Sequence, residues 1–244
     1  MKENETTKAA GKLYLIPSRL GEQPPLEILP LSIRKIINDI NHYIVENEKV
    51  SRAFIKKITP TKSQAELEIY TLNKFTQEIE IPEMLAPCLD GIDVGLMSDA
   101  GCPGVADPGA KAISAAHKKE IQVVPLVGPS SILLALMASG LNGQNFAFNG
   151  YLPIDKAKCK SKIKQLEKRA KQENQSQIII ETPYRNESVL KTLLNSLHPT
   201  SYLTLACDLT LSTEYIRTKT IGEWKSTSLP DLHKKPCVFV FHNY

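Results

Sequence analysis

A loop rich in glycine, proline and aspartate is the strongest candidate for chemistry in this sequence of 244 residues. It spans residues 94–109 (VGLMSDAGCPGVADPG), where an apolar strand runs directly into the loop and a helix follows. Gly101, Gly104 and Gly109 allow the backbone to approach a ligand closely, and two prolines restrict the loop. In parallel α/β sheets, ligands bind beyond the carboxyl ends of the strands. We therefore predict that this loop binds a small-molecule ligand.

Two aspartates in this loop and one earlier glutamate are carboxylates that could take part in the chemistry, and Glu46 and Asp107 are the catalytic candidates. Asp99 follows the strand, Asp107 precedes the helix, and Glu46 ends an earlier apolar run. A carboxylate in such a position can accept a proton as a general base. Each also has a plainer interpretation. Asp107 before a proline is typical of a helix N-cap, Asp99 can begin a turn, and Glu46 can be a solvent-exposed charge.

The glycine spacing argues against two common classes of ligand. The loop contains neither Gly-x-Gly-x-x-Gly nor Gly-Lys-Ser/Thr, so dinucleotides and nucleoside triphosphates are disfavoured. A second stretch, Gly128-Pro129-Ser130-Ser131, repeats the order of strand, tight turn and helix. It is either a second wall of the same site or an ordinary helix start.

Short apolar runs alternate with helical patterns along the chain, which predicts an α/β fold with mainly parallel sheets. The expected strands are Lys12–Ile16, His42–Glu46, Val94–Ser98, Ile121–Pro125, Phe146–Asn149, Gln177–Glu181, Tyr202–Cys207, Glu214–Thr220 and Cys237–His242. The expected helices are Ser32–Asn41, Ser51–Lys57, Pro82–Leu89, Pro108–Lys118, Pro129–Ser139, Asp155–Gln172 and Tyr184–Ser196. The segment Ile58–Ile81 fits neither period and is left open. The Gly140–Gly143 stretch predicts two domains, residues 1–141 and 142–244.

The composition favours a soluble protein of the cytoplasm. The segment Met1–Lys12 is polar and reads as a frayed arm without a signal-peptide core. The longest apolar run, Ser131–Leu141, is about half the length that a membrane span needs. The five cysteines form no Cys-x-x-Cys pair and have no histidine at ligand spacing, so we expect reduced thiols and no metal site. The net charge of +4 permits an anionic partner without requiring one.

Several motifs, taken in order, resemble the tetrapyrrole methylase superfamily. They are Ser98–Gly109, then VPLVGPSS at 124–131, ASGL at 138–141 and FNGYLP at 148–153. Within it, the chain is most similar to the ribosomal RNA small-subunit methyltransferase I family, which 2′-O-methylates a cytidine. Its Glu-Ser-Pro-His-Arg element is matched by ETPYR at 181–185, and its Glu-Leu-Thr-Lys…Glu element by DLT at 208–210 followed by Glu214. The resemblance covers most of the chain from Lys12.

This resemblance implies two α/β domains with S-adenosylmethionine in a cleft between them, and a homodimer. The matching positions imply that Ser98, Asp99, Ala100 and Gly101 line the methionine and ribose side of the cofactor. The remainder of the cofactor would be surrounded by Ser130, Ser131, Tyr151 and Leu152.

The chain departs from the family pattern at three places. After the first strand it reads IPSRLG at 16–21 and continues with three prolines, so the first loop is rebuilt. The family's Glu-Asp-Thr-Arg is Glu46-Asn47-Glu48-Lys49 here, and Leu211 replaces the lysine of the Leu-Thr-Lys element. These positions lie where an acceptor would approach, so they affect the choice of acceptor more than that of cofactor.

Methyl transfer from a sulfonium is an in-line displacement that needs no metal. The enzyme's contribution is to align the acceptor oxygen, the methyl carbon and the sulfur and to exclude water. Because a ribose hydroxyl is a weak acid, a carboxylate that takes its proton would accelerate the reaction. Glu46 is our first candidate for this base, and Asp107 is the second.

The expected helix at 155–172 is strongly basic and points to RNA as a partner. Its apolar positions follow helical spacing as a buried seam. Eight of the chain's thirty lysines and arginines lie on its other faces: Lys156, Lys158, Lys160, Lys162, Lys164, Lys168, Arg169 and Lys171. Such a surface suits the phosphate backbone of RNA, although many charged helix faces are only solvated.

Three functions therefore remain open on the sequence. The leading one is an S-adenosylmethionine-dependent methyltransferase that 2′-O-methylates a ribose of small-subunit ribosomal RNA. The alternatives are a small-molecule, tetrapyrrole-like methyltransferase and a non-catalytic protein that binds S-adenosylmethionine. The basic helix favours RNA, whereas a deep apolar acceptor cavity would favour a metabolite.

Overall fold

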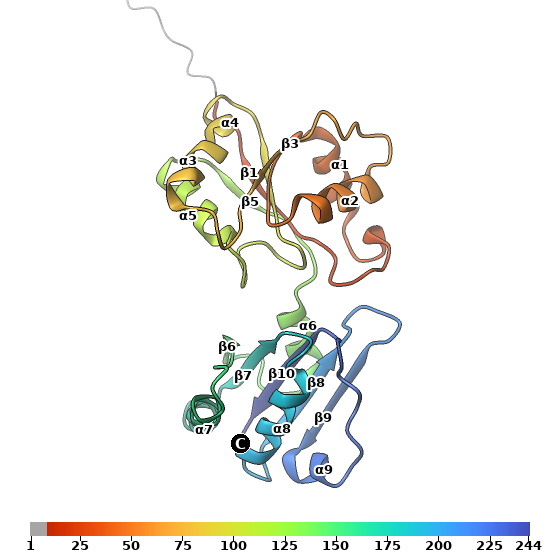
Figure 1. Ribbon diagram of the computed structural model, residues 1–244, viewed down its shortest axis with the longest axis vertical. Helices are drawn as coiled ribbons and strands as arrows, with labels where there is room; N and C mark the ends of the chain where they lie inside the picture. The colour runs from red at the N-terminus through yellow and green to blue at the C-terminus, as the bar shows by residue number, and fades with distance from the viewer. Residues whose placement is uncertain (1–8) are drawn as a thin grey trace, which may run out of the picture. The chain divides into compact units, whose positions relative to one another are not determined.

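The computed structural model describes residues 9–244 and divides into two compact α/β units (Figure 1). The first unit ends at Pro129 and the second begins at Ser130. The boundary expected from the sequence, between residues 141 and 142, lies one helix later. The difference arises because helix α6 (Ser131–Ser139) packs on β8, β9 and β10 of the second unit, where the Thr218 hydroxyl donates to the Ser139 carbonyl at 2.8 Å. The expected arm Met1–Lys12 falls mostly outside the described residues.

The first unit contains a sheet of five parallel strands in the order β3-β2-β4-β1-β5. The strands are β1 Leu13–Ile16, β2 His42–Val45, β3 Glu68–Thr71, β4 Val94–Met97 and β5 Val123–Pro125. All four residues of β4 are buried, as expected for a central strand. A Cβ at Gly95 would lie 2.7 Å from the Ile16 side chain and 2.9 Å from that of Tyr43, so only glycine allows this packing.

Helices cover both faces of this sheet (Figure 1). One face carries α1 (Leu31–Asp39) and α2 (Glu48–Ile58), and the other carries α3 (Ile81–Met84), α4 (Ala86–Leu89) and α5 (Gly109–Lys118). Short 3₁₀ turns lie at Pro25–Glu27 and Glu78–Glu80. Successive strand residues point to opposite faces, so Leu96 joins the core beneath α5 while Met97 joins the core beneath α1 and α2.

The segment that the sequence left open, Ile58–Ile81, contains the edge strand β3. Glu68 and Thr71 of this strand are exposed and its central residues are only half-buried. Because β3 has one neighbour, β2, and little of it is buried, its sequence carries neither a continuous apolar run nor a regular alternation.

The second unit contains a mixed sheet in the order β6-β7-β10-β8-β9. Its strands are β6 Phe146–Tyr151, β7 Ser176–Glu181, β8 Tyr202–Cys207, β9 Tyr215–Thr220 and β10 Cys237–His242. Only β6 and β7 are parallel, so the prediction of a mainly parallel sheet holds for the first unit and is wrong for the second. The reason is that β8 and β9 are joined by a loop without a helix, which returns the chain antiparallel.

Four helices complete the second unit: α6, α7 (Lys156–Gln172), α8 (Asn186–Ser196) and α9 (Ile221–Lys225). They enclose a core that includes Trp224, Phe239 and Phe241. The indole N–H of Trp224 donates to the Leu203 carbonyl at 2.8 Å, which satisfies the polar atom of a fully buried side chain. Helix α9 was not predicted, because five residues are too few to show helical periodicity.

Two cysteines, Cys207 and Cys237, form a disulfide between β8 and β10. The expectation that all five cysteines are reduced is therefore wrong for this pair. The two lie 30 residues apart in sequence, and only the antiparallel register places them opposite each other. The other three, Cys88, Cys102 and Cys159, are free thiols.

Neither membrane spans nor metal clusters are found in the described part of the chain. None of its helices is both long and apolar enough to cross a bilayer. No three histidine, cysteine, aspartate or glutamate side chains among residues 9–244 are grouped as metal ligands.

Candidate active site

The predicted ligand loop follows β4, the strand in the middle of the first sheet, and leads into α5. It is tied to the end of β1 at Ser18. The backbone N–H of Ser18 donates to the Gly101 carbonyl at 2.8 Å, and the N–H of Gly101 donates back to Ser18 at 3.2 Å. The buried Ser18 hydroxyl also donates to the Ser98 carbonyl at 2.8 Å. These bonds hold the loop at the carboxyl edge of a parallel sheet, where ligands bind.

Within the loop, two exposed residues lie between the buried Ser98 and the buried Gly101. Ser98 is buried, and its hydroxyl donates to the Ala100 carbonyl at 3.0 Å. Asp99 and Ala100 are exposed. Gly101 has a φ of +73°, and a Cβ there would lie 3.3 Å from the Leu20 side chain. Because residues with a side chain rarely adopt this backbone conformation, glycine is the residue that permits the turn.

Glu46 lies directly after β2 and reaches this loop. Its carboxylate accepts a hydrogen bond from the backbone N–H of Asp99 at 3.4 Å. Burial raises the pKa of Glu46, and the negative charges of Asp99 and Asp107 raise it further. The hydrogen bond from the Asp99 backbone lowers the pKa, but the net shift is upward. Glu46 is half-buried, so it is more enclosed than a solvent-exposed strand-end charge.

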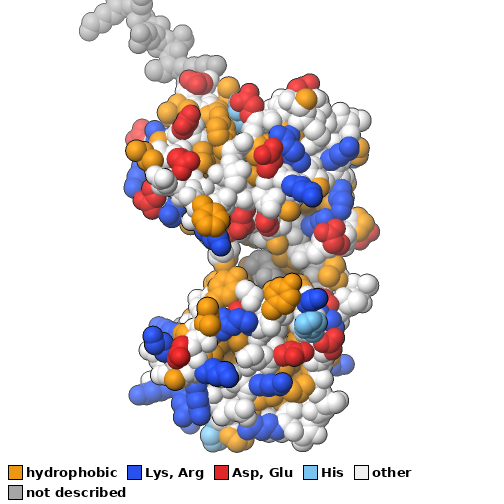
Figure 2. All heavy atoms as spheres, in the orientation of Figure 1, with side chains coloured by type: hydrophobic (Ala, Val, Ile, Leu, Met, Phe, Trp, Pro, Cys, Tyr) orange, Lys and Arg blue, Asp and Glu red, His pale blue; other side chains and the backbone are white. Residues whose placement is uncertain are grey.

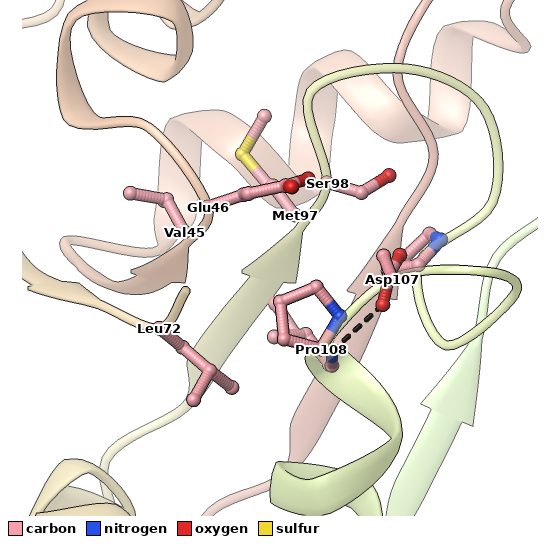
Figure 3. A pocket seen from close by; sticks show the side chains of 10 residues that line it. Val45, Glu46, Leu72, Met97, Ser98, Asp107 and Pro108 are labelled. Atoms are coloured by element: carbon pink, nitrogen blue, oxygen red, sulfur yellow. Dashed lines mark hydrogen bonds between the residues drawn. The ribbon is translucent and has the colours of Figure 1, made fainter. Parts of the chain in front are cut away.

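Asp107 is engaged with the backbone of its own loop (Figure 3). Its carboxylate accepts from the N–H of Gly104 at 2.9 and 3.0 Å. It also accepts from the N–H of Gly109 at 2.7 Å, the bond drawn as a dashed line in Figure 3. Burial raises its pKa, and the two backbone N–H groups and the Ser98 hydroxyl oppose this. Asp107 thus satisfies a backbone donor in the first turn of α5, as the N-cap interpretation expects, although Pro108 is the capping residue.

Figure 3 shows Glu46, Ser98 and Asp107 around one small pocket at the ends of β2 and β4. Its floor is apolar and includes Val45, Leu72 and Met97. Burial also raises the pKa of Asp99. The structure therefore brings three carboxyl groups with raised pKa values to one edge of the sheet, an arrangement that is common at functional sites.

A second, larger pocket of about 140 Å³ is lined in part by Ser98–Ala100. Its walls are the rebuilt first loop (residues 18–22) and the first turns of α2, including Phe54. The loop is braced by Glu22, whose carboxylate contacts Arg19 at 2.8 Å and Lys57 at 3.3 Å. The sequence marked this loop as a departure from the family, but gave no sign that α2 would form the opposite wall.

The other expected cofactor residues belong to the second unit. Ser130 is the N-cap of α6 and accepts from the N–H of Leu133 at 3.5 Å, and Ser131 begins that helix. Tyr151 is 57% exposed at the end of β6. Leu152 is buried in the core of the second unit, so its side chain is not available to a ligand.

At the end of β7, the second unit holds an ion pair that the sequence motif did not reveal. The Glu181 side chain is 1% exposed and contacts the Arg185 guanidinium at 3.1 Å. Arg185 also donates to the Pro153 carbonyl at 3.3 Å, and the neighbouring Tyr184 is exposed. A buried carboxylate therefore orients a partly exposed cation beside an exposed aromatic ring.

The loop between β8 and β9 contains the other family-like element. Asp208 accepts from the Thr213 hydroxyl at 2.9 Å, and Glu214 accepts from the N–H of Thr210 at 2.8 Å. Asp208 and Thr210 both have positive φ, 50° and 72°. The acidic residues of this element therefore fix the shape of their own loop, and Leu211 lies partly exposed between them.

Comparison with known proteins gives consistent matches. Residues 27–225 match the model of the tetrapyrrole (corrin/porphyrin) methylases. A ribosomal RNA small subunit methyltransferase I from Vibrio cholerae is 26% identical, over 100% of this chain and 82% of its own. The crystal structure of the methyltransferase CobJ has a TM-score of 0.63 at 14% identity and covers 96% of this chain and 95% of its own. A Thermus thermophilus uroporphyrin-III C-methyltransferase, solved with S-adenosylhomocysteine, has a TM-score of 0.54 at 16% identity and covers 96% and 98%.

Proposed function

Since this chain belongs to the tetrapyrrole methylase family and is a methyltransferase, we propose that it methylates ribosomal RNA of the small subunit at a ribose 2′-hydroxyl. The observation that carries the proposal is the similarity along the chain to ribosomal RNA small subunit methyltransferases I. The cofactor is S-adenosylmethionine, and the acceptor atom is the more specific part of the proposal.

The loop at the end of β4 fits this cofactor. The exposed Asp99 carboxylate is a suitable acceptor for ribose hydroxyls or for the ammonium group of an amino acid. Because Gly101 has no side chain, the cofactor can approach the backbone closely at this turn. We assign the same contact surface to Ser98 and Ala100, and we assign contacts with the rest of the cofactor to Ser130, Ser131, Tyr151 and the backbone of Leu152.

When bound, S-adenosylmethionine supplies an electrophilic methyl group on a positively charged sulfur. Glu46 accepts the proton that the acceptor hydroxyl loses as its oxygen forms the new bond. The raised pKa of Glu46 suits this role, because a carboxylate with a higher pKa is a stronger base. Asp107 keeps the loop in shape through its bonds to Gly104 and Gly109, and is the second candidate for the base.

We assign the approach of the acceptor to the pocket between the first loop and α2, since this is where the chain differs most from the family pattern. Asp99 and Ala100 are exposed in the wall of this pocket, whereas Arg19 is paired with Glu22 and Phe54 is 4% exposed.

The experiment that tests this function uses small ribosomal subunits from cells that lack the protein. Labelled methyl transfer from S-adenosylmethionine should yield a single 2′-O-methylated nucleotide, identified by mass spectrometry of nuclease digests. Methylation of a base would agree with an RNA methyltransferase but would contradict the ribose 2′-hydroxyl as the acceptor. Cofactor binding by calorimetry without transfer to any ribosomal substrate would favour the metabolite methyltransferase or the non-catalytic binding protein.

We further propose that the protein acts in the cytoplasm as a homodimer. Exposed apolar side chains such as Phe75 and Ile79 in the first unit and Met137 in the second are candidates for burial between two copies. Light scattering coupled to gel filtration should give twice the chain mass of 27.1 kDa.

A further inference from the structure

A groove in the second unit is lined by residues other than those of the candidate active-site loop. Its volume is about 740 Å³, and its walls are the C-terminal half of α7, residues 196–200 and the two residues that follow β10. This volume is within the range of pockets that hold a small molecule or a nucleotide. All of its walls belong to one compact unit.

One wall of the groove is a row of lysines. Lys164, Lys168 and Lys171 line it and are exposed, and their spacing places them on one face of α7. None of the three forms an ion pair with any residue among 9–244, whereas Arg169, on another face, pairs with Glu173 at 3.2 Å. The row extends for roughly 10 Å along the helix, which spans more than one phosphate of a nucleic-acid strand. Figure 2 shows lysine and arginine side chains gathered over the α7 side of this unit.

The acidic residue in the groove wall does not neutralise this row. Glu167 points its carboxylate to the adjacent loop, where it accepts from the N–H of His198 at 2.6 Å and from the Ser201 hydroxyl at 2.5 Å. It therefore holds the opposite wall in place. The groove retains three cationic side chains against one carboxylate that is already engaged in hydrogen bonds.

An aromatic ring lies at the groove beside these lysines. Tyr244 lines it and is 66% exposed. Its ring packs edge-to-face against His242, with centroids 4.2 Å apart, and against Tyr202 at 5.8 Å. Neither contact is a parallel stack, so the neighbours fix the orientation of the ring without stacking on it. Exposed aromatic rings beside basic side chains are the usual platform for bases of a single strand.

We propose that this groove binds an unpaired segment of RNA, with its phosphates on Lys164, Lys168 and Lys171 and one base stacked on Tyr244. That this RNA is ribosomal rests on the proposed function. It selects an unpaired segment because an A-form duplex keeps its bases stacked inside and offers none to an aromatic ring.

The first test compares two matched pairs on the same helix. K164Q/K168Q removes two groove lysines, and K158Q/K162Q removes two lysines at the same i, i+4 spacing that do not line the groove. Binding to a fluorescent single-stranded RNA is measured by anisotropy across a salt series. K164Q/K168Q should weaken binding about tenfold near 150 mM salt and reduce the slope of log K against log salt by roughly 1.4. An equal loss of affinity in both variants would contradict binding in the groove and indicate a general effect of the charge of α7.

The second test examines the aromatic ring. Y244A should weaken binding to the same RNA about tenfold with little change in the salt slope, and Y244F should bind like the wild type, because the ring is what stacks. Unchanged binding by Y244A would reject the base-stacking part of the proposal. Tighter wild-type binding to a fully duplex RNA than to the single strand would reject the unpaired segment.

Methyl transfer to small ribosomal subunits separates this proposal from the proposed function. If the wild type binds RNA through the groove lysines but transfers no methyl group, the proposed function is wrong and RNA binding by the groove is supported. If the wild type methylates the subunits and K164Q/K168Q has the same kcat/KM as K158Q/K162Q, the proposed function is supported and the role of the groove in binding this RNA is rejected. Affinity for S-adenosylmethionine, measured by calorimetry, should be the same in all of these variants.

Discussion

The Glu46 carboxylate accepts a hydrogen bond from the backbone N–H of Asp99, 3.4 Å away, and thereby joins the end of β2 to the loop after β4. Strands β2 and β4 are neighbours in the sheet, so the pairing of two parallel strands sets this distance. Glu46 consequently lies beside the loop that we assign to the cofactor, in surroundings that disfavour its ionised form.

Glu46→Gln should lower kcat by roughly 10²–10⁴-fold, because the amide cannot accept the proton of the acceptor hydroxyl. In the wild type, kcat should rise with pH through an apparent pKa above 4.5, since burial and two nearby carboxylates raise the pKa of Glu46 and only its ionised form is active. This limb should vanish in E46Q. The matched control is Glu48→Gln, whose carboxylate pairs with Arg52 on the exposed side of α2. A pH limb that persists in E46Q would assign the base elsewhere.

Asp107→Ala should destabilise the first unit by about 1–3 kcal/mol, because the N–H groups of Gly104 and Gly109 lose their acceptor in a partly buried loop. Asp107→Asn should cost less, since its amide oxygen still accepts. Urea unfolding measures both, and calorimetry should show weaker cofactor binding in D107A than in D107N. If D107N instead abolished turnover with unchanged stability and cofactor affinity, Asp107 would be the base.

Gly101→Val should abolish binding of S-adenosylmethionine without unfolding the protein. The substitution places a branched side chain at a φ of +73°, next to Leu20 and in the turn that faces the ligand. Gly140→Val is the control, because Gly140 has a φ of +70° and no atom within 4 Å of the added Cβ. Both variants should lose about 1–3 kcal/mol of stability, and only G101V should lose the cofactor. Wild-type affinity of G101V in calorimetry would reject our site.

Arg185→Gln should destabilise the second unit by about 2 kcal/mol, because it leaves the Glu181 carboxylate buried without a cation. The effect is smaller than for a fully enclosed pair, since the Arg185 side chain is 30% exposed. E181Q/R185Q should recover part of the loss, and a double-mutant cycle in urea gives the coupling energy. If the loss of stability in the double variant equals the sum of the two single losses, the coupling energy is zero and the pair contributes nothing.

The sequence predicted those parts of the fold that depend on local pattern. The apolar runs Tyr202–Cys207 and Cys237–His242 are bounded by turn residues and coincide with β8 and β10. Strand direction was not predictable, because a buried strand has the same alternation whether its neighbour is parallel or antiparallel. The edge strand β3 escaped detection, since half of it faces solvent.

Prediction of the site followed the same division. Glu46 was predicted because it ends an apolar run and matches the family pattern, and Asp99 because it begins the loop that resembles the family. The structure adds that their strands are parallel neighbours, which places both carboxylates at one edge of the sheet. The engagement of Asp107 with Gly104 and Gly109 depends on the folded shape of the loop, and so does the wall that α2 supplies to the pocket. The Cys207–Cys237 disulfide depends on a register that no local spacing encodes.

The position of β10 has a consequence for how the protein is made. This strand lies between β7 and β8, although it follows both of them in the chain. All strands of the first sheet end by Pro125, so that sheet can assemble on the ribosome while the rest is still being translated. In the second unit, β7 and β8 each keep an unpaired edge until residues 237–242 emerge and insert between them. The nascent chain therefore carries a finished first sheet, with the loop that we assign to the cofactor, attached to an open, aggregation-prone half-sheet until β10 emerges.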